Sequence, residues 1–469
     1  MVQLVGDRIL VPFSGEGSGE CEVTWGQRNI LRMMQLAGEA VMIGGTIPLE
    51  EGTTVEQIVH LLAFIVERNH SLRTRYRIRE DGEPMQVLSS SGEVALDIVD
   101  IGPDEDPAEV AEKVRAGYEH GPFDIATDWP VKMAVIRRGE ELLYFAAMYP
   151  HIAIDGLGFE ALVGDLANLD RETGEHLAPR EGMQPFDLAR QQQAPTALRQ
   201  SAASVAYWEK MVRQVQGRRF DTEYEPRDPQ WWDLTFESKA AYLAATCIAA
   251  RTGANTGSIL LGAHAVGLAK VSGKSTSAIR TFVSNRFRPG LRETVTPLLA
   301  SCLCLVDVAD TDFDTVALRA WQAQLKAGKY AYFDPRDLLA MFDRVGAERD
   351  EEVDLLCYFN DLRRASAAVR PGPLPTPEEI EAALPLTTLT WGPHTDVPDA
   401  QTFMELNPVP DTVNFLLRVD TEKVTPEEQE QIVREMERIL VAAAFDPACP
   451  TGISAQAALS ASGAPAPAQ

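Results

Sequence analysis

Apolar residues recur along this chain with two spacings, one typical of helices and one typical of strands. Within residues 54–69 they return every three or four positions, which is the period of an amphipathic helix, and a threonine can cap its start. Residues 132–136 and 142–149 form two apolar runs joined by an Arg-Arg-Gly-Glu turn, which predicts a β-hairpin. The same criteria predict further helices at residues 29–40, 106–118, 157–169, 197–215, 240–251, 256–271, 314–330 and 427–444. They predict further strands at residues 8–13, 72–78, 85–88, 94–99, 277–284, 299–308, 353–359, 387–391, 403–406 and 412–419.

Helices and strands are mixed throughout the chain, which indicates an α/β protein. A single hydrophobic core stops growing near ~250–300 residues, so 469 residues predict two domains. Residues 174–196 are polar and contain Pro and Gln, which makes them the best candidate for a linker. We therefore predict an N-terminal domain over residues 1–180, a linker over 181–196 and a C-terminal domain over 197–450. The Ala-, Ser- and Pro-rich residues 451–469 are predicted to form a disordered tail.

Acidic residues outnumber basic ones by 69 to 43, which gives a formal net charge of −26. This charge disfavours binding to nucleic acids and to anionic membranes, because both require basic surfaces. No apolar run approaches the ~18–20 residues that span a bilayer, and the N-terminal sequence lacks the features of a signal peptide. The six cysteines are scattered without a CxxC pair. We therefore expect no metal site, and the free thiols of a cytoplasmic protein.

Two motifs resemble phosphate-binding loops only in part. The sequence Ser-Gly-Glu-Gly-Ser-Gly at residues 14–19 carries a glutamate that would repel phosphate. Gly273-Lys274-Ser275-Thr276 follows a predicted helix and precedes a predicted strand, which is the reverse of the order in a P-loop. We interpret both as polar turns. Cys302 and Cys304 alternate on a predicted strand, where we expect them to pack as small apolar side chains.

One motif combines groups that can catalyse proton transfer. The predicted strand 142–149 leads into an H-x-x-x-D-G sequence formed by His151, Asp155 and Gly156, and a predicted helix follows. An imidazole can accept a proton near neutral pH, a nearby carboxylate can fix the local geometry, and a glycine lets a substrate approach the backbone. A structural histidine at a strand-to-helix turn would have the same spacing. The pattern also arises by chance in roughly a few per cent of such chains, so the spacing alone leaves both interpretations open.

The motif resembles the active-site signature of the CoA-dependent acyltransferase superfamily, which includes chloramphenicol acetyltransferases and the condensation domains of nonribosomal peptide synthetases. Further stretches resemble condensation-domain motifs in the same order, so the resemblance covers nearly all of residues 5–447. These stretches are Thr24-Trp25-Gly26-Gln27-Arg28, Arg68-Asn69-His70-Ser71-Leu72-Arg73-Thr74-Arg75-Tyr76, Pro122-Phe123-Asp124 with Trp129-Pro130, Val283-Ser284-Asn285-Arg286, and Tyr358-Phe359-Asn360.

The sequence departs from the condensation-domain pattern at two places. Peptide-forming members carry two adjacent histidines; here Pro150 replaces the first, and His151 corresponds to the second, which is the base in the family. Single-histidine versions occur among acyltransferases of the same fold, including ester-forming ones. The usual Phe-Val-Asn-Thr strand is replaced by Ala-Ser-Cys-Leu-Cys-Leu at residues 300–305. The sequence shows no adenylation or carrier domain, so we expect a free-standing enzyme.

The resemblance implies two chloramphenicol-acetyltransferase-like α/β sandwich subdomains that form a V-shaped pseudo-dimer with the active site in a tunnel between them. It implies an acyltransferase that joins a thioester-bound acyl group to an amine or hydroxyl acceptor in natural-product biosynthesis, such as antibiotic biosynthesis. His151 would be the catalytic base, and the Gly156 N–H an oxyanion donor. Asp155 would pair with Arg286 across the two halves to shape the loop, and Asn360 would line the tunnel. The chemistry would need no bound cofactor and no metal.

The same resemblance implies the partners. The acyl donor would be a phosphopantetheine thioester on an acyl or peptidyl carrier protein, or on CoA, and the acceptor a small molecule. We expect a monomer that binds neither nucleic acid nor membranes. Because carrier proteins are often acidic, docking would need a basic patch; the Arg-rich residues 213–219, 286–292 and 363–364 are candidates, with a solvated face as the alternative for each. The alternative function is a catalytically degenerate condensation-like domain that acts as a binding or recruitment module.

Overall fold

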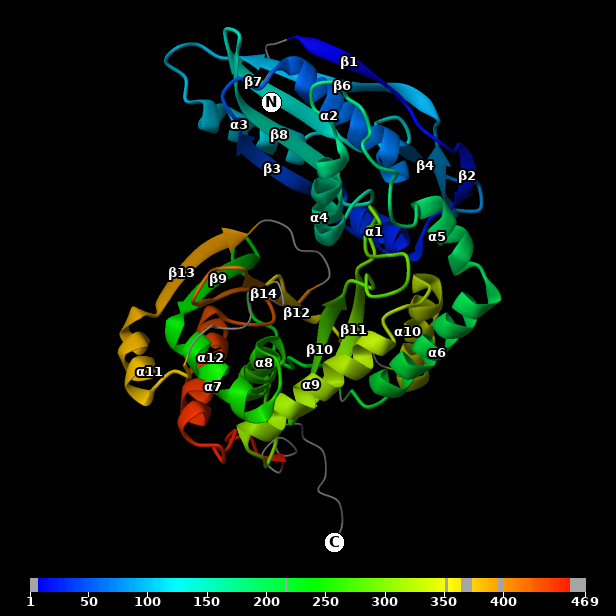
Figure 1. The fold of residues 1–469 in the computed structure, drawn as a ribbon. Coiled ribbons are helices and arrows are strands. Elements are labelled where there is room, and N and C mark those ends of the chain that lie inside the picture. The colour runs from blue at the N-terminus through cyan, green and yellow to red at the C-terminus, as the bar shows by residue number, and fades with distance from the viewer. Residues whose placement is uncertain (1–6, 216, 351–352, 364–372, 395–399, 456–469) are drawn as a thin grey trace. The chain divides into compact units, whose positions relative to one another are not determined.

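The computed structural model describes residues 7–215, 217–350, 353–363, 373–394 and 400–455, and it has the mixed α/β architecture predicted from the sequence (Figure 1). The chain divides into two compact units. Residues up to Gln200 form the first unit together with the segment Ser284–Ala300, and the second unit consists of Ser201–Val283 and the residues from Ser301 onward. The structure therefore differs from the predicted linear division, because residues 181–200 and 284–300 belong to the first unit.

The first unit is built on a five-stranded sheet with the order β1 (Arg8–Ser14), β6 (Ser91–Asp100), β7 (Lys132–Arg138), β8 (Glu141–Pro150) and β3 (Met42–Pro48). Of these neighbours, β6 and β7 run parallel and the others run antiparallel. The sheet is buried on both faces, because Met133 and Val135 pack with α2 (Val55–Arg68), whereas Ala134 and Ile136 pack with α3 (Pro107–Glu119). Figure 1 shows α2 lying across one face of this sheet.

A smaller antiparallel sheet of β2 (Gly19–Glu22), β5 (Pro84–Leu88) and β4 (Thr74–Ile78) completes the strands of this unit. Beside it lie α1 (Trp25–Ala37), which Thr24 and Gln27 begin with a capping box, and the short 3-10 helix His70–Arg73 that follows α2. The predicted linker differs from the structure, since α5 (Pro185–Gln192) lies within it and buries Phe186 and Leu188. The helix α4 (Gly156–Asp165) follows the motif that contains His151.

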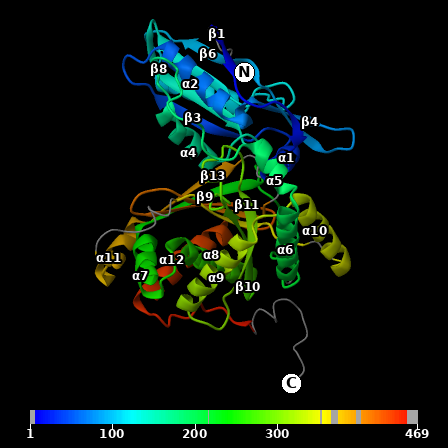
Figure 2. The ribbon, with the colours of Figure 1, turned by 45° about the vertical axis from the view of Figure 1, so that its right-hand side comes forward.

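The second unit contains a seven-stranded sheet. Three helices cover one of its faces, namely α7 (Lys239–Thr252), α8 (Thr256–Ser272) and α12 (Pro426–Phe445) (Figures 1 and 2). The strand order is β11 (Ala300–Asp307), β10 (Thr276–Val283), β12 (Cys357–Asp361), β14 (Thr402–Asn407), β15 (Val413–Asp420), β9 (Trp231–Ser238) and β13 (Thr388–His394). The pairs β10–β12 and β12–β14 are parallel. The remaining helices of the second half are α6 (Pro195–Val212), α9 (Phe313–Lys329), α10 (Pro335–Arg349) and α11 (Pro377–Ala383).

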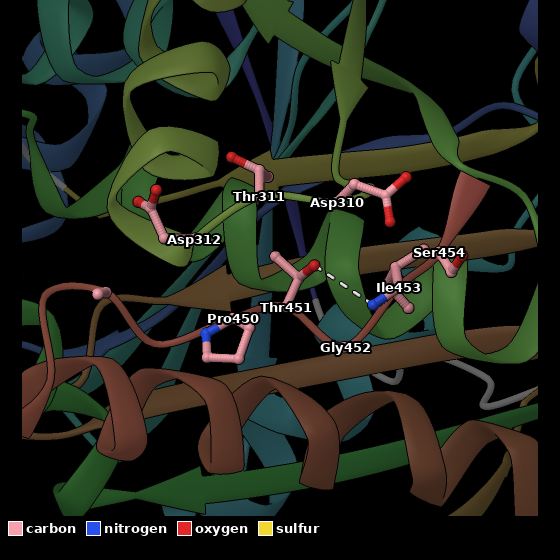
Figure 3. A pocket seen from close by; sticks show the side chains of 9 residues that line it. Asp310, Thr311, Asp312, Pro450, Thr451, Gly452, Ile453 and Ser454 are labelled. Atoms are coloured by element: carbon pink, nitrogen blue, oxygen red, sulfur yellow. Dashed lines mark hydrogen bonds between the residues drawn. The ribbon is translucent and has the colours of Figure 1, made fainter. Parts of the chain in front are cut away.

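The start of the predicted disordered tail is part of the second unit. The Asp310 N–H donates to the carbonyl of Ile453 at 2.9 Å, and the Thr451 N–H donates to the carbonyl of Thr311 at 3.1 Å. Together these two segments surround a hollow of about 650 Å³ (Figure 3). The prediction of disorder from residue 451 therefore does not hold for residues 451–455, and residues 456–469 lie outside the described part of the chain. None of the described helices combines the length and the apolar character that crossing a bilayer requires.

Candidate active site

The motif with His151 forms a tight connection between the end of β8 and the start of α4. The His151 N–H donates to the carbonyl of Val41 at 2.7 Å, and the Ala153 N–H donates to the carbonyl of Pro150 at 2.9 Å. The three residues after His151 are fully buried, which anchors the connection in the core. The sequence thus places His151 at a backbone position that is fixed on both sides.

The imidazole of His151 has one buried nitrogen and one accessible nitrogen. The side chain as a whole is half-buried. Its Nδ1 is shielded from solvent and has no hydrogen-bond partner among the described residues, whereas Nε2 is neither buried nor hydrogen-bonded within them. Nε2 is therefore the nitrogen that can exchange a proton with a bound molecule.

Asp155 is fully engaged in structural hydrogen bonds. It is the N-cap of α4, where its Oδ1 accepts the Gly158 N–H at 2.7 Å, and its Oδ2 accepts the Leu298 N–H at 2.9 Å. Oδ1 also accepts a hydrogen bond from Nη2 of Arg286 in a buried ion pair. No hydrogen bond joins Asp155 to His151 among the described residues, so the carboxylate shapes the loop rather than orienting the imidazole.

The predicted Asp155–Arg286 ion pair is thus confirmed, but it lies within the first unit and does not join two domains, because residues 284–300 belong to that unit. Arg286 also holds its own segment together. Its Nη1 donates to the carbonyl of Thr294 at 2.6 Å, and its Nη2 donates to that of Thr296 at 3.2 Å. The guanidinium therefore closes residues 286–296 into a compact loop at the start of α4.

Two glycines allow this loop to approach closely. A Cβ on Gly26, in the first turn of α1, would lie 1.9 Å from the carbonyl oxygen of Pro297. A Cβ on Gly158 would lie 3.0 Å from Oδ1 of Asp155 and 3.1 Å from Nη2 of Arg286. Gly26, and Gly158 two residues after the His151 motif, therefore both allow the close packing of residues 284–300.

A buried chain of hydrogen bonds connects the first two motifs to the His151 loop. Nε2 of Gln27 donates to the hydroxyl of Tyr76 at 3.3 Å, and this hydroxyl donates to the carbonyl of Ile152 at the same distance. Sequence reasoning named Tyr76 only as the last residue of a motif and missed this contact. The available signal was the alternation of Arg75, Tyr76 and Arg77, which turns the tyrosine away from both charged side chains and indicates a buried hydroxyl that needs a polar partner.

The other contacts of residues 68–76, the second stretch that resembles a condensation-domain motif, are structural. Arg68 makes a buried, bidentate ion pair with Asp165, with both N···O distances at 2.8 Å, and this pair joins the end of α2 to the end of α4. Arg73 donates to the carbonyls of Glu16, Gly17 and Ser89. The glycine-rich loop therefore presents carbonyls to a cation, which supports its interpretation as a turn, since a phosphate site presents N–H groups.

The remaining candidates lie in the second unit. Asn360 is on β12, where its side chain hydrogen-bonds to Glu405 of β14. Lys274 follows the left-handed cap Gly273 of α8 and pairs with Asp221 at 2.9 Å, which confirms the predicted helix-to-strand turn. Cys302 and Cys304 are buried on β11, as expected.

Several arginines of the three candidate basic patches are paired with acidic residues or buried. Arg213 pairs with Glu209 and Glu348, and Arg363 pairs with Asp361. Arg219 and Arg286 are buried. Arg364 lies outside the described residues.

Comparison with known proteins identifies relatives among peptide synthetases. Over 350 residues the chain is 23% identical to tyrocidine synthase 3 of Brevibacillus parabrevis, a match that covers 73% of this chain and 5% of that protein. Over 311 residues it is 24% identical to phosphinothricin tripeptide synthetase PhsC of Streptomyces viridochromogenes, covering 61% of this chain and 27% of that protein. The chain therefore spans only a small part of the length of these relatives.

Solved structures share the fold at low sequence identity. The SgcC5 protein from Streptomyces globisporus aligns with a TM-score of 0.67 and 18% identity, and the alignment covers 92% of this chain and 100% of that one. The X-domain from teicoplanin biosynthesis aligns with a TM-score of 0.68 and 16% identity, covering 92% of this chain and 97% of that one. The first condensation domain of the calcium-dependent antibiotic synthetase aligns with a TM-score of 0.66 and 15% identity, covering 93% and 98%. These likenesses establish the chloramphenicol-acetyltransferase-like fold of condensation domains. Because residues 19–360 also match the family model of the condensation domain, this chain belongs to the condensation-domain family.

Proposed function

We propose that this protein is an acyltransferase that moves an acyl group from a thioester on a phosphopantetheine arm to an amine or hydroxyl acceptor. The observation that carries the proposal is the accessible Nε2 of His151, at the end of a loop that Asp155, Arg286 and Tyr76 fix in place. A base held in one position by buried contacts is suited to general base catalysis, because proton transfer requires a defined geometry.

In the proposed reaction, Nε2 of His151 accepts the proton of the acceptor's N–H or O–H while that atom bonds to the thioester carbonyl carbon. The carbon–sulfur bond then breaks, and the imidazolium returns the proton to the departing thiolate. The products are an amide or an ester and the free pantetheine thiol. No metal or other cofactor takes part in the proposed reaction.

The N–H of Gly156 is the proposed donor to the oxyanion of the tetrahedral intermediate. Gly156 is the first residue of α4, where backbone N–H groups have no acceptor within the helix. Asp155 takes up the N–H of Gly158 and leaves that of Gly156 for another acceptor. A donor that is already oriented stabilises developing charge without reorganising.

Pro150 leaves this arrangement intact. It is buried at the end of β8, pairs with Met42 of β3, and its carbonyl accepts the Ala153 N–H. We propose that a single histidine is sufficient for the acyl transfer. Ester formation is therefore one of the candidate reactions.

The proposed donors are acyl groups on a carrier protein or on CoA, because the relatives above are synthetases of peptide natural products. The test is to mix the purified protein with acyl-carrier and acyl-CoA donors and a panel of amines and alcohols, and to follow thiol release and product mass. We expect product without ATP. Activity that requires ATP or an added metal and ignores thioesters would overturn the proposal.

The similarity to the X-domain supports a second candidate, a binding module. A structure of that domain in complex with OxyB aligns with this chain with a TM-score of 0.67. For this chain the second candidate predicts stable capture of a partner enzyme and no thioester turnover. The same donor and acceptor panel separates the two functions, since a module gives no product at any substrate concentration.

A further inference from the structure

The seven-stranded sheet of the second unit has one face that α7, α8 and α12 do not cover. Along β14 and β15, Met404, Leu406 and Leu417 are fully buried against these helices, whereas Phe403 and Glu405 alternate with them and are half-buried. We call this the open face; it is formed by Arg280, Phe282, Tyr358, Phe403, Glu405 and Arg418.

The strand register places these side chains in two adjacent rows. Tyr358, Phe403 and Arg418 are direct neighbours across β12, β14 and β15. In the next row, Asn360 is the direct neighbour of Glu405. Because side chains two positions apart on a strand share a face, both rows project from the same side of the sheet.

Three aromatic rings form a continuous apolar surface within these rows. The centroids of Tyr358 and Phe403 are 5.4 Å apart with an angle of 21° between the rings. Phe282 lies 5.9 Å from Tyr358 and 6.0 Å from Phe403, with angles of 15° and 33°. Phe282 and Phe403 are partly exposed and can contact the apolar part of a ligand, whereas Tyr358 itself is buried.

One acid on the open face lacks a cation of its own. Asp233, on β9, accepts hydrogen bonds from Nε and Nη2 of Arg418 at 2.8 and 3.1 Å. Its Oδ2 also lies 3.3 Å from Nδ1 of His394. Glu405, in contrast, forms no ion pair among the described residues. Burial raises the pKa of Glu405, while the charge of Arg418 and the hydrogen bond from Asn360 act in the opposite direction.

At the other end of the aromatic surface, Arg280 forms no ion pair with any residue that the structure describes. Arg280 lies over Tyr358, with its Cζ 4.9 Å from the ring centroid. It donates to the hydroxyls of Tyr358 at 2.7 Å and Ser301 at 2.6 Å, which are both neutral. A ligand cation is therefore repelled at the Arg280 end and attracted at the Glu405 end, which fixes its orientation.

We propose that the Glu405 carboxylate and the aromatic side chains of Phe282, Tyr358 and Phe403 bind a small organic cation, in which an ammonium or a guanidinium stands next to an apolar segment. The site lies wholly within the second unit and goes beyond the proposed acyl transfer. The occupant supplies the cation that Glu405 lacks and stacks its apolar part on the rings.

The test measures binding directly, with phenethylamine as the probe and 2-phenylethanol as its neutral counterpart. Ligand NMR titrations at millimolar concentrations give both affinities for the full chain. We expect the amine to bind at least about tenfold more tightly than the alcohol, as an ion pair with the half-buried Glu405 carboxylate predicts. Glu405→Gln should abolish this difference, and Phe403→Leu should weaken the binding of both probes.

The control is Glu237→Gln, which removes a carboxylate from β9 instead of β14 and should keep the preference for the amine. Thermal melts confirm that each variant is folded. The inference is overturned if wild-type protein does not prefer the amine, or if Glu405→Gln retains the preference. A protein that prefers the amine but never turns over a thioester contradicts the proposed function alone, so the two failures are distinguishable.

Discussion

The guanidinium of Arg286 lies against the carboxylate of Asp155, which precedes it by 131 residues, and both side chains are more than nine-tenths buried. The pair joins the N-terminus of α4 to the loop 284–300, and every contact of Asp155 is to this local frame. The carboxylate therefore fixes the position of the His151 loop and makes no hydrogen bond to the imidazole among the described residues.

Replacing Asp155 should damage folding and activity together. Asp155→Ala removes the cap of α4 and leaves Arg286 buried without its counter-ion, at a cost of ~3–5 kcal/mol in the free energy of unfolding. A fall of this size appears as a clear drop in Tm. Asp155→Asn keeps one acceptor oxygen for these N–H groups and should lose less. If Asp155→Ala melts like wild type but has lost turnover, the carboxylate takes part in the chemistry and its structural assignment is wrong.

Replacing His151 should damage activity alone. The imidazole makes no hydrogen bond within the described residues, so His151→Ala should leave Tm close to that of wild type. Loss of a general base should lower kcat by ~10²–10⁴. Added imidazole should restore part of the rate in this variant, because the side chain leaves a space beside an otherwise intact loop. Wild-type turnover by His151→Ala would exclude the residue from the mechanism.

Elements with one apolar stripe were predictable from the sequence. The helix expected at residues 54–69 is α2 (Val55–Arg68), because Thr54 caps it and its buried residues recur with helical spacing. The helix α10 (Pro335–Arg349) was missed, although its buried residues Pro335, Leu338, Met341 and Val345 recur with helical spacing. The five consecutive apolar residues 338–342 obscure that period in the sequence.

The candidate site was predictable only in part, for a different reason. His151, Asp155 and Gly156 are adjacent in sequence, so their spacing is visible. The partner of Asp155 was named through a family resemblance, because no local pattern links a carboxylate to an arginine in another part of the chain. The contact of Tyr76 with Ile152 and the packing of residues 284–300 with the first unit depend on tertiary structure, which leaves no periodic signal.

The two glycines that open α4 should respond differently to the same substitution. A Cβ on Gly158 meets Asp155 and Arg286 at 3.0 and 3.1 Å, so Gly158→Ala should displace the ion pair and cost about 1–3 kcal/mol. A Cβ on Gly156 meets nothing within 4 Å, so Gly156→Ala should change stability by less than about 0.5 kcal/mol. Thermal melts of both variants test the packing.

Turnover measurements on the same two variants test the role of Gly156. If the substrate approaches the backbone there, Gly156→Ala should lower kcat/KM in a protein of unchanged Tm. Equal losses of stability in the two variants would contradict the geometry described for the ion pair.

Acid should destabilise the second unit through His264. This residue is fully buried in α8, neither ring nitrogen has a hydrogen-bond partner among the described residues, and burial together with the charge of Arg219 lowers its pKa from 6.5 to about 3. Between these values the unfolded chain binds a proton that the folded chain does not, so stability is present above pH 6.5 and is lost as the pH falls toward 3. Between pH 7 and pH 5, His264 alone should lower the free energy of unfolding by about 2 kcal/mol. Urea denaturation at pH 7 and pH 5 measures this loss of unfolding free energy. The loss should be about 2 kcal/mol smaller in His264→Leu than in wild type. It should be unchanged in the control His120→Gln, because the side chain of His120 is 73% exposed. If His264→Leu shows the same loss between pH 7 and pH 5 as wild type, His264 is not the group that titrates on unfolding.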